Sequence, residues 1–202
     1  MTSPLDEPPG HVPVASFEEQ YRAEDDPWRF ASSAYEQRRY ALTVAMLPTR
    51  RYRSAFEPGC SIGELTQRLA HRCDHLLEMD ASSTAVARAR ERCRGLDHVE
   101  VVVGELPQDW PAGSFDLIVL SELGYYFNTE GWARLVGRSV DAVANHGTLL
   151  AVHWRGRSAD HILHGDLVHV VARRVASAGG LRLAGSYIEA AFRADVWTKG
   201  AA

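Results

Sequence analysis

From residue 54 to residue 199 the chain alternates between short apolar runs and longer segments with helical spacing, and this alternation most constrains the fold. Strands are predicted at 54–59, 75–80, 99–105, 115–122, 147–154, 181–190 and 191–199. Helices are predicted between them at 62–73, 82–94, 129–144 and 166–180. Such an order favours an α/β, doubly wound, mostly parallel sheet of seven strands, in which the last hairpin supplies a C-terminal antiparallel strand.

The residues before this alternation predict a tail and two helices. Residues 1–15 are rich in proline and polar side chains, which is typical of a disordered tail. A first helix is predicted to begin at Ser16, with Glu19 completing a capping box. A second is predicted from 32 to 47, ended by Pro48. We therefore expect one domain over 16–202, with lid helices at 16–48 and a core at 52–198.

Composition excludes several classes of protein. The chain has 202 residues and a net charge of −4, whereas nucleic-acid binders usually carry a basic excess. It has neither an apolar run of membrane-spanning length nor the pattern of a signal peptide, so we expect no membrane partner. Three irregularly spaced cysteines predict neither disulfides nor a metal site, which favours the cytoplasm. The oligomeric state stays open.

The segment Gly59 to Gly63, "GCSIG", admits two interpretations. As G-x-S-x-G it matches the nucleophile elbow of serine hydrolases, with Ser61 as nucleophile. That elbow needs an oxyanion loop from an earlier strand–helix unit, and here only predicted helices precede it. As a glycine-rich turn after the first strand it matches a nucleotide site instead. Position in the chain favours the second interpretation, although the first is not excluded.

Acidic residues at later strand ends support a nucleotide site. Asp80 ends the second strand, where a carboxylate accepts hydrogen bonds from ribose hydroxyls, and Glu105 ends the third, within reach of an adenine amino group. The turn lacks the middle glycine of dinucleotide sites. Glu57 at the strand end would repel a diphosphate but attract an ammonium group. These charges favour a zwitterionic sulfonium ligand over a dinucleotide.

Four segments, "FEPGCSIGELTQRLA", "LLEMDAS", "VGELP" and "FDLIVLSELGYYF", resemble the ordered motifs of class I S-adenosylmethionine-dependent methyltransferases. The resemblance implies a Rossmann-like fold, S-adenosyl-L-methionine as cofactor and S-adenosyl-L-homocysteine as product. Ser61 stands at the middle glycine of the first motif, and Glu105 stands where many members have Asp. The implied cofactor-binding residues are Glu57, Gly59, Cys60, Ser61, Gly63, Asp80, Ala81, Gly104, Glu105, Leu106, Ser121 and Glu122.

The segment 25–48, "DDPWRFASSAYEQRRYALTVAMLP", resembles the start of the nodulation protein S (NodS)-like N-methyltransferases. Known members of that group methylate the free amine of a deacetylated chitooligosaccharide, so the resemblance implies a small-molecule amine acceptor. Trp28 and Tyr35 are expected lid residues over the cofactor. Ala34 replaces the tryptophan usual before Tyr35, which changes the expected shape of that lid.

Candidate catalytic residues follow the fourth and fifth strands. His153 is the first candidate for a general base, because an unperturbed imidazole titrates near neutral pH. Glu122 and Tyr125 are expected to orient an amine, and His161 or His164 is an alternative base. No metal is expected. Three alternatives stay open: O-methylation of a small metabolite, serine hydrolysis at Ser61, and cofactor binding without catalysis.

Overall fold

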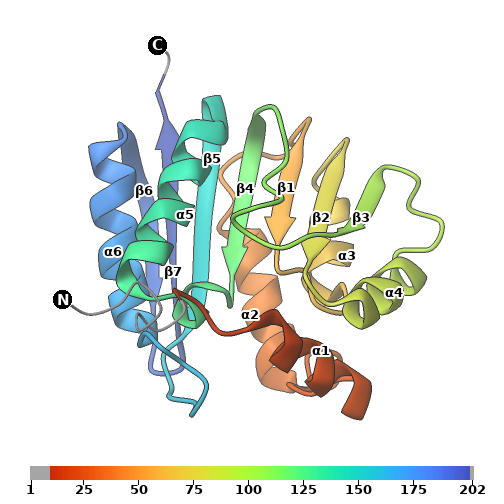
Figure 1. Ribbon diagram of the computed structural model, residues 1–202. Coiled ribbons are helices and arrows are strands. Elements are labelled where there is room, and N and C mark those ends of the chain that lie inside the picture. The colour runs from red at the N-terminus through yellow and green to blue at the C-terminus, as the bar shows by residue number, and fades with distance from the viewer. Residues whose placement is uncertain (1–9, 201–202) are drawn as a thin grey trace.

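The computed structural model describes residues 10–200, which form a seven-stranded sheet with helices on both faces (Figure 1). The strand order is β3-β2-β1-β4-β5-β7-β6, and β7 alone runs opposite to the other six strands. The predicted doubly wound sheet with an antiparallel C-terminal strand is therefore confirmed. The strands are β1 Ala55–Pro58, β2 Leu76–Asp80, β3 Val99–Val103, β4 Phe115–Ser121, β5 Val143–Trp154, β6 Leu181–Ile188 and β7 Phe192–Lys199.

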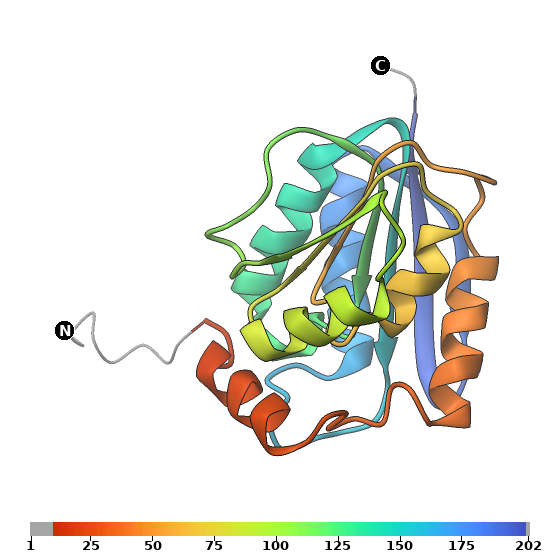
Figure 2. The same cartoon turned by 90° about the vertical axis from the view of Figure 1, so that its right-hand side faces the viewer.

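Six α-helices and one 3₁₀ turn accompany the strands over residues 10–200. Helices α5 and α6 cover one face of the sheet, and α2 and α3 cover the other (Figure 2). Within that part of the chain, no helix combines the length and the apolar character needed to cross a membrane. The elements are α1 Val14–Ala23, α2 Ala34–Ala45, α3 Glu64–Ala70, α4 Ser83–Arg92, η1 Gly124–Tyr126, α5 Thr129–Ala142 and α6 Gly165–Ala178.

The central strand β4 explains why its sequence is almost continuously apolar. Leu117 and Val119 pack into the cluster beneath α2 and α3, whereas Ile118 and Leu120 pack into the cluster beneath α5 and α6. All four are essentially inaccessible to solvent. Because alternate side chains point to opposite faces, a strand covered on both sides must be apolar at every position.

The topology indicates where the sheet borders a crevice. The chain winds from β1 toward β3 in one direction and from β4 toward β6 in the other, so the order reverses between β1 and β4. In open α/β sheets the carboxyl ends of the strands at such a reversal border a crevice. Helix α1 lies across this edge of the sheet (Figures 1 and 2).

The first helix begins earlier than predicted. Helix α1 starts at Val14 after Pro13, and no side chain caps it. The Ser16 hydroxyl donates backward to the Pro13 carbonyl at 2.7 Å, so the predicted capping box with Glu19 is wrong. The Ser16 amide donates to the Pro13 carbonyl at 3.1 Å, so the first turn closes through the backbone without a side-chain cap.

Residues 10–15, which the sequence assigns to a disordered tail, are attached to the fold. Residues 1–9 lie outside the described part of the chain, so that portion of the prediction is untested. Beyond it, the Val12 amide donates to the Tyr126 carbonyl and the Asn128 amide donates to the Gly10 carbonyl, each at 2.8 Å. These bonds attach the segment before α1 to the turn that follows β4.

The boundary between α5 and β5 also differs from the prediction. The sequence predicts that the residues "NHG" separate a helix ending at 144 from a strand beginning at 147, but α5 ends at Ala142 and β5 begins at Val143. His146 adopts a positive φ of 62°, and the pairing of β4 with β5 shifts register between Phe115 and Leu117. The turn-like residues therefore form an irregularity within a long strand.

Candidate active site

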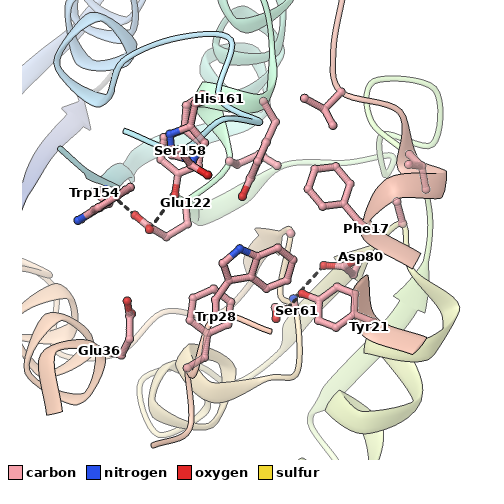
Figure 3. A pocket seen from close by; sticks show the side chains of 18 of the residues that line it. Phe17, Tyr21, Trp28, Glu36, Ser61, Asp80, Glu122, Trp154, Ser158 and His161 are labelled. Atoms are coloured by element: carbon pink, nitrogen blue, oxygen red, sulfur yellow. Dashed lines mark hydrogen bonds between the residues drawn. The ribbon is translucent and has the colours of Figure 1, made fainter. Parts of the chain in front are cut away.

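A cavity of about 790 Å³ opens at the carboxyl edge of the sheet. The ends of β1 to β5 form its floor, while α1, residues 28–36 and residues 154–161 form its walls. Figure 3 shows two ends separated by Trp28. One end presents Ser61, Asp80 and Tyr21, and the other presents Glu122, Trp154 and His161.

The turn after β1 places backbone groups against Asp80. Gly59 has φ +76° and Ser61 has φ +54°, both in the left-handed region. This conformation directs the Ser61 amide to the Asp80 carboxylate at 2.9 Å, and the Ser82 amide donates to the other carboxylate oxygen at 2.9 Å. Burial raises the pKa of Asp80, although these backbone donors oppose the shift. Each carboxylate oxygen retains a lone pair for a further donor.

The ends of β2 and β3 form the sides of a narrow slot. Met79, Ala81, Gly104, Glu105 and Leu106 line it. A Cβ added at Gly104 would lie 2.9 Å from the Met79 sulfur, so glycine lets the two strand ends approach closely. The slot thus joins apolar side chains to one partly exposed carboxylate, which suits a flat heterocycle with an exocyclic amino group.

Aromatic residues of the N-terminal segment close this end of the cavity. Trp28 lines the cavity, and its ring lies 5.2 Å from that of Tyr21. The Tyr21 hydroxyl donates to the Ser61 hydroxyl oxygen at 2.5 Å. Within residues 10–200 no histidine hydrogen-bonds to Ser61, so this serine lacks the base that a hydrolase nucleophile requires. Sequence reasoning did not identify Tyr21.

Helix α1 is attached to the first turn of α4 by one carboxylate. Glu18 accepts hydrogen bonds from the Ser82 hydroxyl at 2.6 Å and from the Thr84 hydroxyl at 2.7 Å. These donors lower the pKa of Glu18 to about 2. A carboxylate at a helix N-terminus is also stabilised by the helix dipole. This contact, which no local motif predicts, fixes the lid above the end of β2.

Two acids lie buried beneath the glycine turn. Glu57 and Glu78 are almost inaccessible to solvent, and the Thr66 hydroxyl lies 3.1 Å and 3.0 Å from their respective carboxylates. Burial raises the pKa of Glu57 to about 7 and that of Glu78 well above its usual range, where the neighbouring Glu57 adds to the effect. Glu57 does not line the cavity, so the direct contact with a cofactor that the sequence predicts is not supported.

At the opposite end, Glu122 receives two hydrogen bonds and forms an ion pair. Its carboxylate accepts the Trp154 amide at 2.7 Å and the Tyr125 hydroxyl at 2.7 Å. A nitrogen of the Arg39 guanidinium lies 3.3 Å away. Glu122 also adopts a positive φ of 55° directly after β4. Glu122 and Tyr125 both line the cavity, as expected from the sequence.

Arg39 and Glu36 add two charged side chains next to Glu122 at this end of the cavity. Arg39 is 1% exposed and forms an ion pair with Glu36 as well as with Glu122. Burial raises the pKa of Glu36, and Arg39 opposes that shift. When both acids are ionised, two carboxylates face one guanidinium, so the local charge is negative. Neither Glu36 nor Arg39 was identified from the sequence, because their pairing depends on how α2 docks.

His161 lies on the same wall. Its ring stacks on Tyr125 with centroids 3.8 Å apart, and it lines the cavity. Burial lowers its pKa, so the ring is neutral near pH 7. Its Nδ1 is buried without a hydrogen-bond partner within residues 10–200. Of the two loop histidines that the sequence suggested as alternative bases, His161 faces the cavity and His164 caps α6 instead.

His153 does not reach the cavity, so the prediction that it is the general base is wrong. Its side chain is fully buried, and its Nε2 accepts the Gly124 amide at 3.0 Å. Burial lowers its pKa well below the usual range. A base must contact the group that it deprotonates. The strand pattern could not reveal that this side chain points toward α6 rather than toward the crevice.

Three predicted cofactor residues support the turn without lining the cavity. Cys60 packs against Val86 and Val101, and Gly63 has φ +81° as it enters α3. The Ser121 hydroxyl accepts from Arg39 at 3.3 Å. Direct contact between a cofactor and Cys60, Gly63 or Ser121 is therefore not supported. Tyr35 does line the cavity, and within residues 10–200 its buried hydroxyl has no partner.

No group of three histidine, cysteine or acidic side chains within residues 10–200 converges on a point where a metal ion would bind.

Comparison with known proteins decides the family. The profile of the family described as nodulation protein S (NodS) matches residues 14–155. The chain belongs to the NodS family. The family member from Sinorhizobium fredii is 31% identical over 153 residues, covering 75% of this chain and 65% of that protein. The member from Bradyrhizobium diazoefficiens is 39% identical over 111 residues, covering 54% of this chain and 52% of that protein. The chain thus spans only part of these curated NodS relatives.

Solved structures show the same fold. A Pseudomonas syringae protein described as a methyltransferase is 42% identical, with a TM-score of 0.73 over 83% of this chain and 100% of that chain. The N-methyltransferase NodS from Bradyrhizobium japonicum WM9, solved with S-adenosyl-L-homocysteine, has a TM-score of 0.77 at 21% identity and covers 92% of this chain and 98% of that chain. The fold is thus the Rossmann-like fold of methyltransferases.

Proposed function

We propose that the chain is an S-adenosyl-L-methionine-dependent methyltransferase that methylates the nitrogen of a small amine, such as an amino sugar. One observation carries the proposal: the same cavity is lined at one end by the glycine turn after β1 and by Asp80, and at the other end by Glu36 and Glu122, which share the Arg39 guanidinium. Membership of the NodS family and the N-methyltransferase activity named for a structural relative support it.

The residues at the first end fit the proposed cofactor. Asp80 retains acceptor capacity toward two ribose hydroxyls, and Glu105 offers a carboxylate to an adenine amino group. Met79 and Leu106 supply apolar surface for the ring, and Tyr21 with Trp28 excludes water above it. S-adenosyl-L-methionine, when bound, supplies a methyl group on a positively charged sulfur, which makes that methyl electrophilic.

The residues at the second end fit an amine. The carboxylates of Glu36 and Glu122 accept hydrogen bonds from an ammonium or amine and attract positive charge. Tyr125 donates to Glu122 and so orients that carboxylate. An amine reacts only after it loses its extra proton, and we assign the acceptance of that proton to His161, which lines the cavity and stacks on Tyr125. The protein contributes mainly alignment, proton removal and exclusion of water.

Two of the alternatives receive less support. Serine hydrolysis would need a base beside Ser61, whose hydroxyl instead contacts Tyr21. O-methylation would need an acceptor without positive charge, which the two carboxylates at the second end disfavour. A cytoplasmic location stays part of the proposal, in line with three free, buried cysteines.

The test measures S-adenosyl-L-homocysteine formation from S-adenosyl-L-methionine with a panel of amines, each paired with its hydroxyl analogue, for example glucosamine with glucose. We expect turnover with at least one amine and little with its analogue. Turnover with the hydroxyl partner alone would show O-methylation. Cofactor binding without turnover on any acceptor of a broad panel would favour the non-catalytic alternative.

A variant tests the proposed base separately. His161→Phe retains an aromatic ring against Tyr125 but removes the proton acceptor. We expect about a 100-fold loss of turnover near pH 7, the usual scale of general-base catalysis, with partial recovery as the amine deprotonates at higher pH. Calorimetry with S-adenosyl-L-homocysteine should show unchanged affinity. Full activity of this variant would remove the role assigned to His161.

A further inference from the structure

A chain of buried polar side chains connects β7 to the turn that bears Glu122 and Tyr125. The Gly124 amide donates to His153 Nε2 at 3.0 Å. His153 Nδ1 lies 3.3 Å from His169 Nε2, and His169 Nδ1 lies 2.8 Å from an Asp195 carboxylate oxygen. The three side chains come from β5, α6 and β7, and each is inaccessible to solvent.

The order of hydrogen bonds fixes where each proton sits. A backbone amide only donates, so His153 Nε2 is unprotonated and its proton is on Nδ1. That proton faces His169 Nε2, which leaves the His169 proton on Nδ1 toward Asp195. Burial lowers the pKa of both histidines, which agrees with two neutral rings. Although burial opposes it, donation from His169 and Ser186 lowers the pKa of Asp195 to about 2.

The near end of this chain is a backbone amide and not the cavity. The chain therefore cannot carry a proton to a substrate, but it can hold the 3₁₀ turn Gly124–Tyr126 in one position. Gly124 has no room to move toward its neighbours, since an added Cβ would lie 2.4 Å from Val168. Burying two imidazoles and a carboxylate is costly unless each is hydrogen-bonded, as they are here.

We propose that His153, His169 and Asp195 are positioning residues: they hold His153 in the tautomer that accepts the Gly124 amide and so place Glu122 and Tyr125 for the acceptor. The proposal rests on the proposed function for its effect on turnover. The tautomer of His153 and its hydrogen bond to the Gly124 amide do not depend on which acceptor the protein uses.

The first test needs no acceptor. Nitrogen NMR of protein labelled in the histidine rings should show an unprotonated Nε2 and a protonated Nδ1 for His153 at neutral pH. Asp195→Ala removes the acceptor that keeps the His169 proton on Nδ1, so that His169 and, through it, His153 are no longer held in one tautomer. We expect faster hydrogen exchange at the Gly124 amide in that variant. A protonated Nε2 in the wild type, or unchanged exchange in a folded variant, would overturn the proposal.

A matched pair of variants provides the second test. His153→Gln places an acceptor near the Nε2 position, whereas His153→Asn places its polar atoms near Nδ1 and leaves the Gly124 amide unpaired. On the best acceptor of the panel we expect the asparagine variant to lose about 100-fold in kcat, the scale of a small misplacement of reacting groups, with unchanged affinity for S-adenosyl-L-homocysteine. The glutamine variant should recover most of this loss.

The outcomes separate the two proposals. Equal loss in both variants would show that His153 merely fills space and would overturn the inference. Should the asparagine variant not fold, the NMR and exchange measurements still decide it. Absence of turnover by the wild type on every acceptor would count against the proposed function, and the tautomer of His153 would remain measurable.

Discussion

The two ends of the cavity are built in different ways. The floor of the end with Asp80 comes from one continuous stretch of chain, in which three successive strand ends and one glycine turn present backbone amides and the carboxylates of Asp80 and Glu105. The opposite end uses side chains from α2, β4, β5 and the loop after β5, connected by Arg39, Glu122 and Tyr125. Backbone geometry dominates the first end and long-range charge pairing dominates the second.

This difference predicts which substitutions each end of the cavity tolerates. At the first end the bonds to Asp80 come from the backbone amides of Ser61 and Ser82, so these two bonds do not depend on the serine hydroxyls. At the second end Glu122 has several simultaneous partners, so that replacing it disturbs a whole network. We expect variants of the first end to change cofactor affinity, and variants of the second to change turnover.

The largest expected effect comes from the acceptor end. Glu122→Gln removes the negative charge shared with Arg39 and weakens the bond from Tyr125. We expect turnover on the best amine to fall about 100-fold through loss of alignment. The matched change Glu130→Gln, at an exposed position on α5, should have no effect. Steady-state kinetics measures both. Normal turnover in Glu122→Gln would mean that this carboxylate does not orient the acceptor.

A smaller effect is expected from the glycine turn. Gly59→Ala forces a Cβ into the left-handed region and within 3.3 Å of Leu123, at a cost of about 1–2 kcal/mol. Gly95→Ala has a similar φ of +84° with no atom within 4 Å, so it reproduces the strain away from the cavity. Thermal unfolding should show both destabilised, while calorimetry with S-adenosyl-L-homocysteine should show weaker binding for Gly59→Ala alone. Equal affinities of Gly59→Ala and Gly95→Ala for S-adenosyl-L-homocysteine would show that this turn does not contribute to cofactor binding.

We expect a smaller effect on cofactor affinity from Tyr21, which lies on the lid helix α1. Tyr21→Phe removes the hydroxyl that donates to Ser61, and a single hydrogen bond contributes about 1 kcal/mol. We expect a severalfold loss of affinity for S-adenosyl-L-homocysteine. Tyr187→Phe removes a hydroxyl that contacts Arg38 and Glu189 outside the cavity, and it should leave that affinity unchanged. An effect of the same size in both variants would point to general destabilisation.

The smallest effect concerns pH and the acids beneath the turn. Burial raises the pKa of Glu57 from 4.5 to about 7, so the folded state binds more protons than the unfolded state between these values. Stability from this group is therefore complete below pH 4.5 and is lost as pH rises through 7. Denaturant unfolding from about pH 5 to about pH 8 should show the wild type losing stability relative to Glu57→Gln. A difference independent of pH would contradict the assignment.

The end with Asp80 could largely be located from sequence. Carboxyl ends of parallel strands meet at one edge, so the positions of Gly59, Asp80 and Glu105 at three strand ends are enough to place them together. The motif could not distinguish residues that line the cavity from residues that only support the turn. Cys60 and Gly63 belong to the same motif, yet they serve packing and backbone geometry.

The acceptor end could be located only in part. Glu122 and Tyr125 follow a strand whose type was clear, but Glu36 and Arg39 depend on how α2 docks against the sheet. The error at His153 has a similar origin. Its surroundings are set by His169 on α6 and Asp195 on β7, which are distant in sequence, and a strand pattern gives no access to such pairings.

The most direct test of the division between the two ends is calorimetric titration of S-adenosyl-L-homocysteine into the wild type, Asp80→Ala and Glu122→Gln. Loss of two charge-assisted hydrogen bonds should weaken binding to Asp80→Ala by about 100-fold, while Glu122→Gln should bind as the wild type does. Asp97→Ala, at an exposed loop position, serves as the control. Wild-type affinity in Asp80→Ala, or an equal loss in Glu122→Gln, would contradict the account.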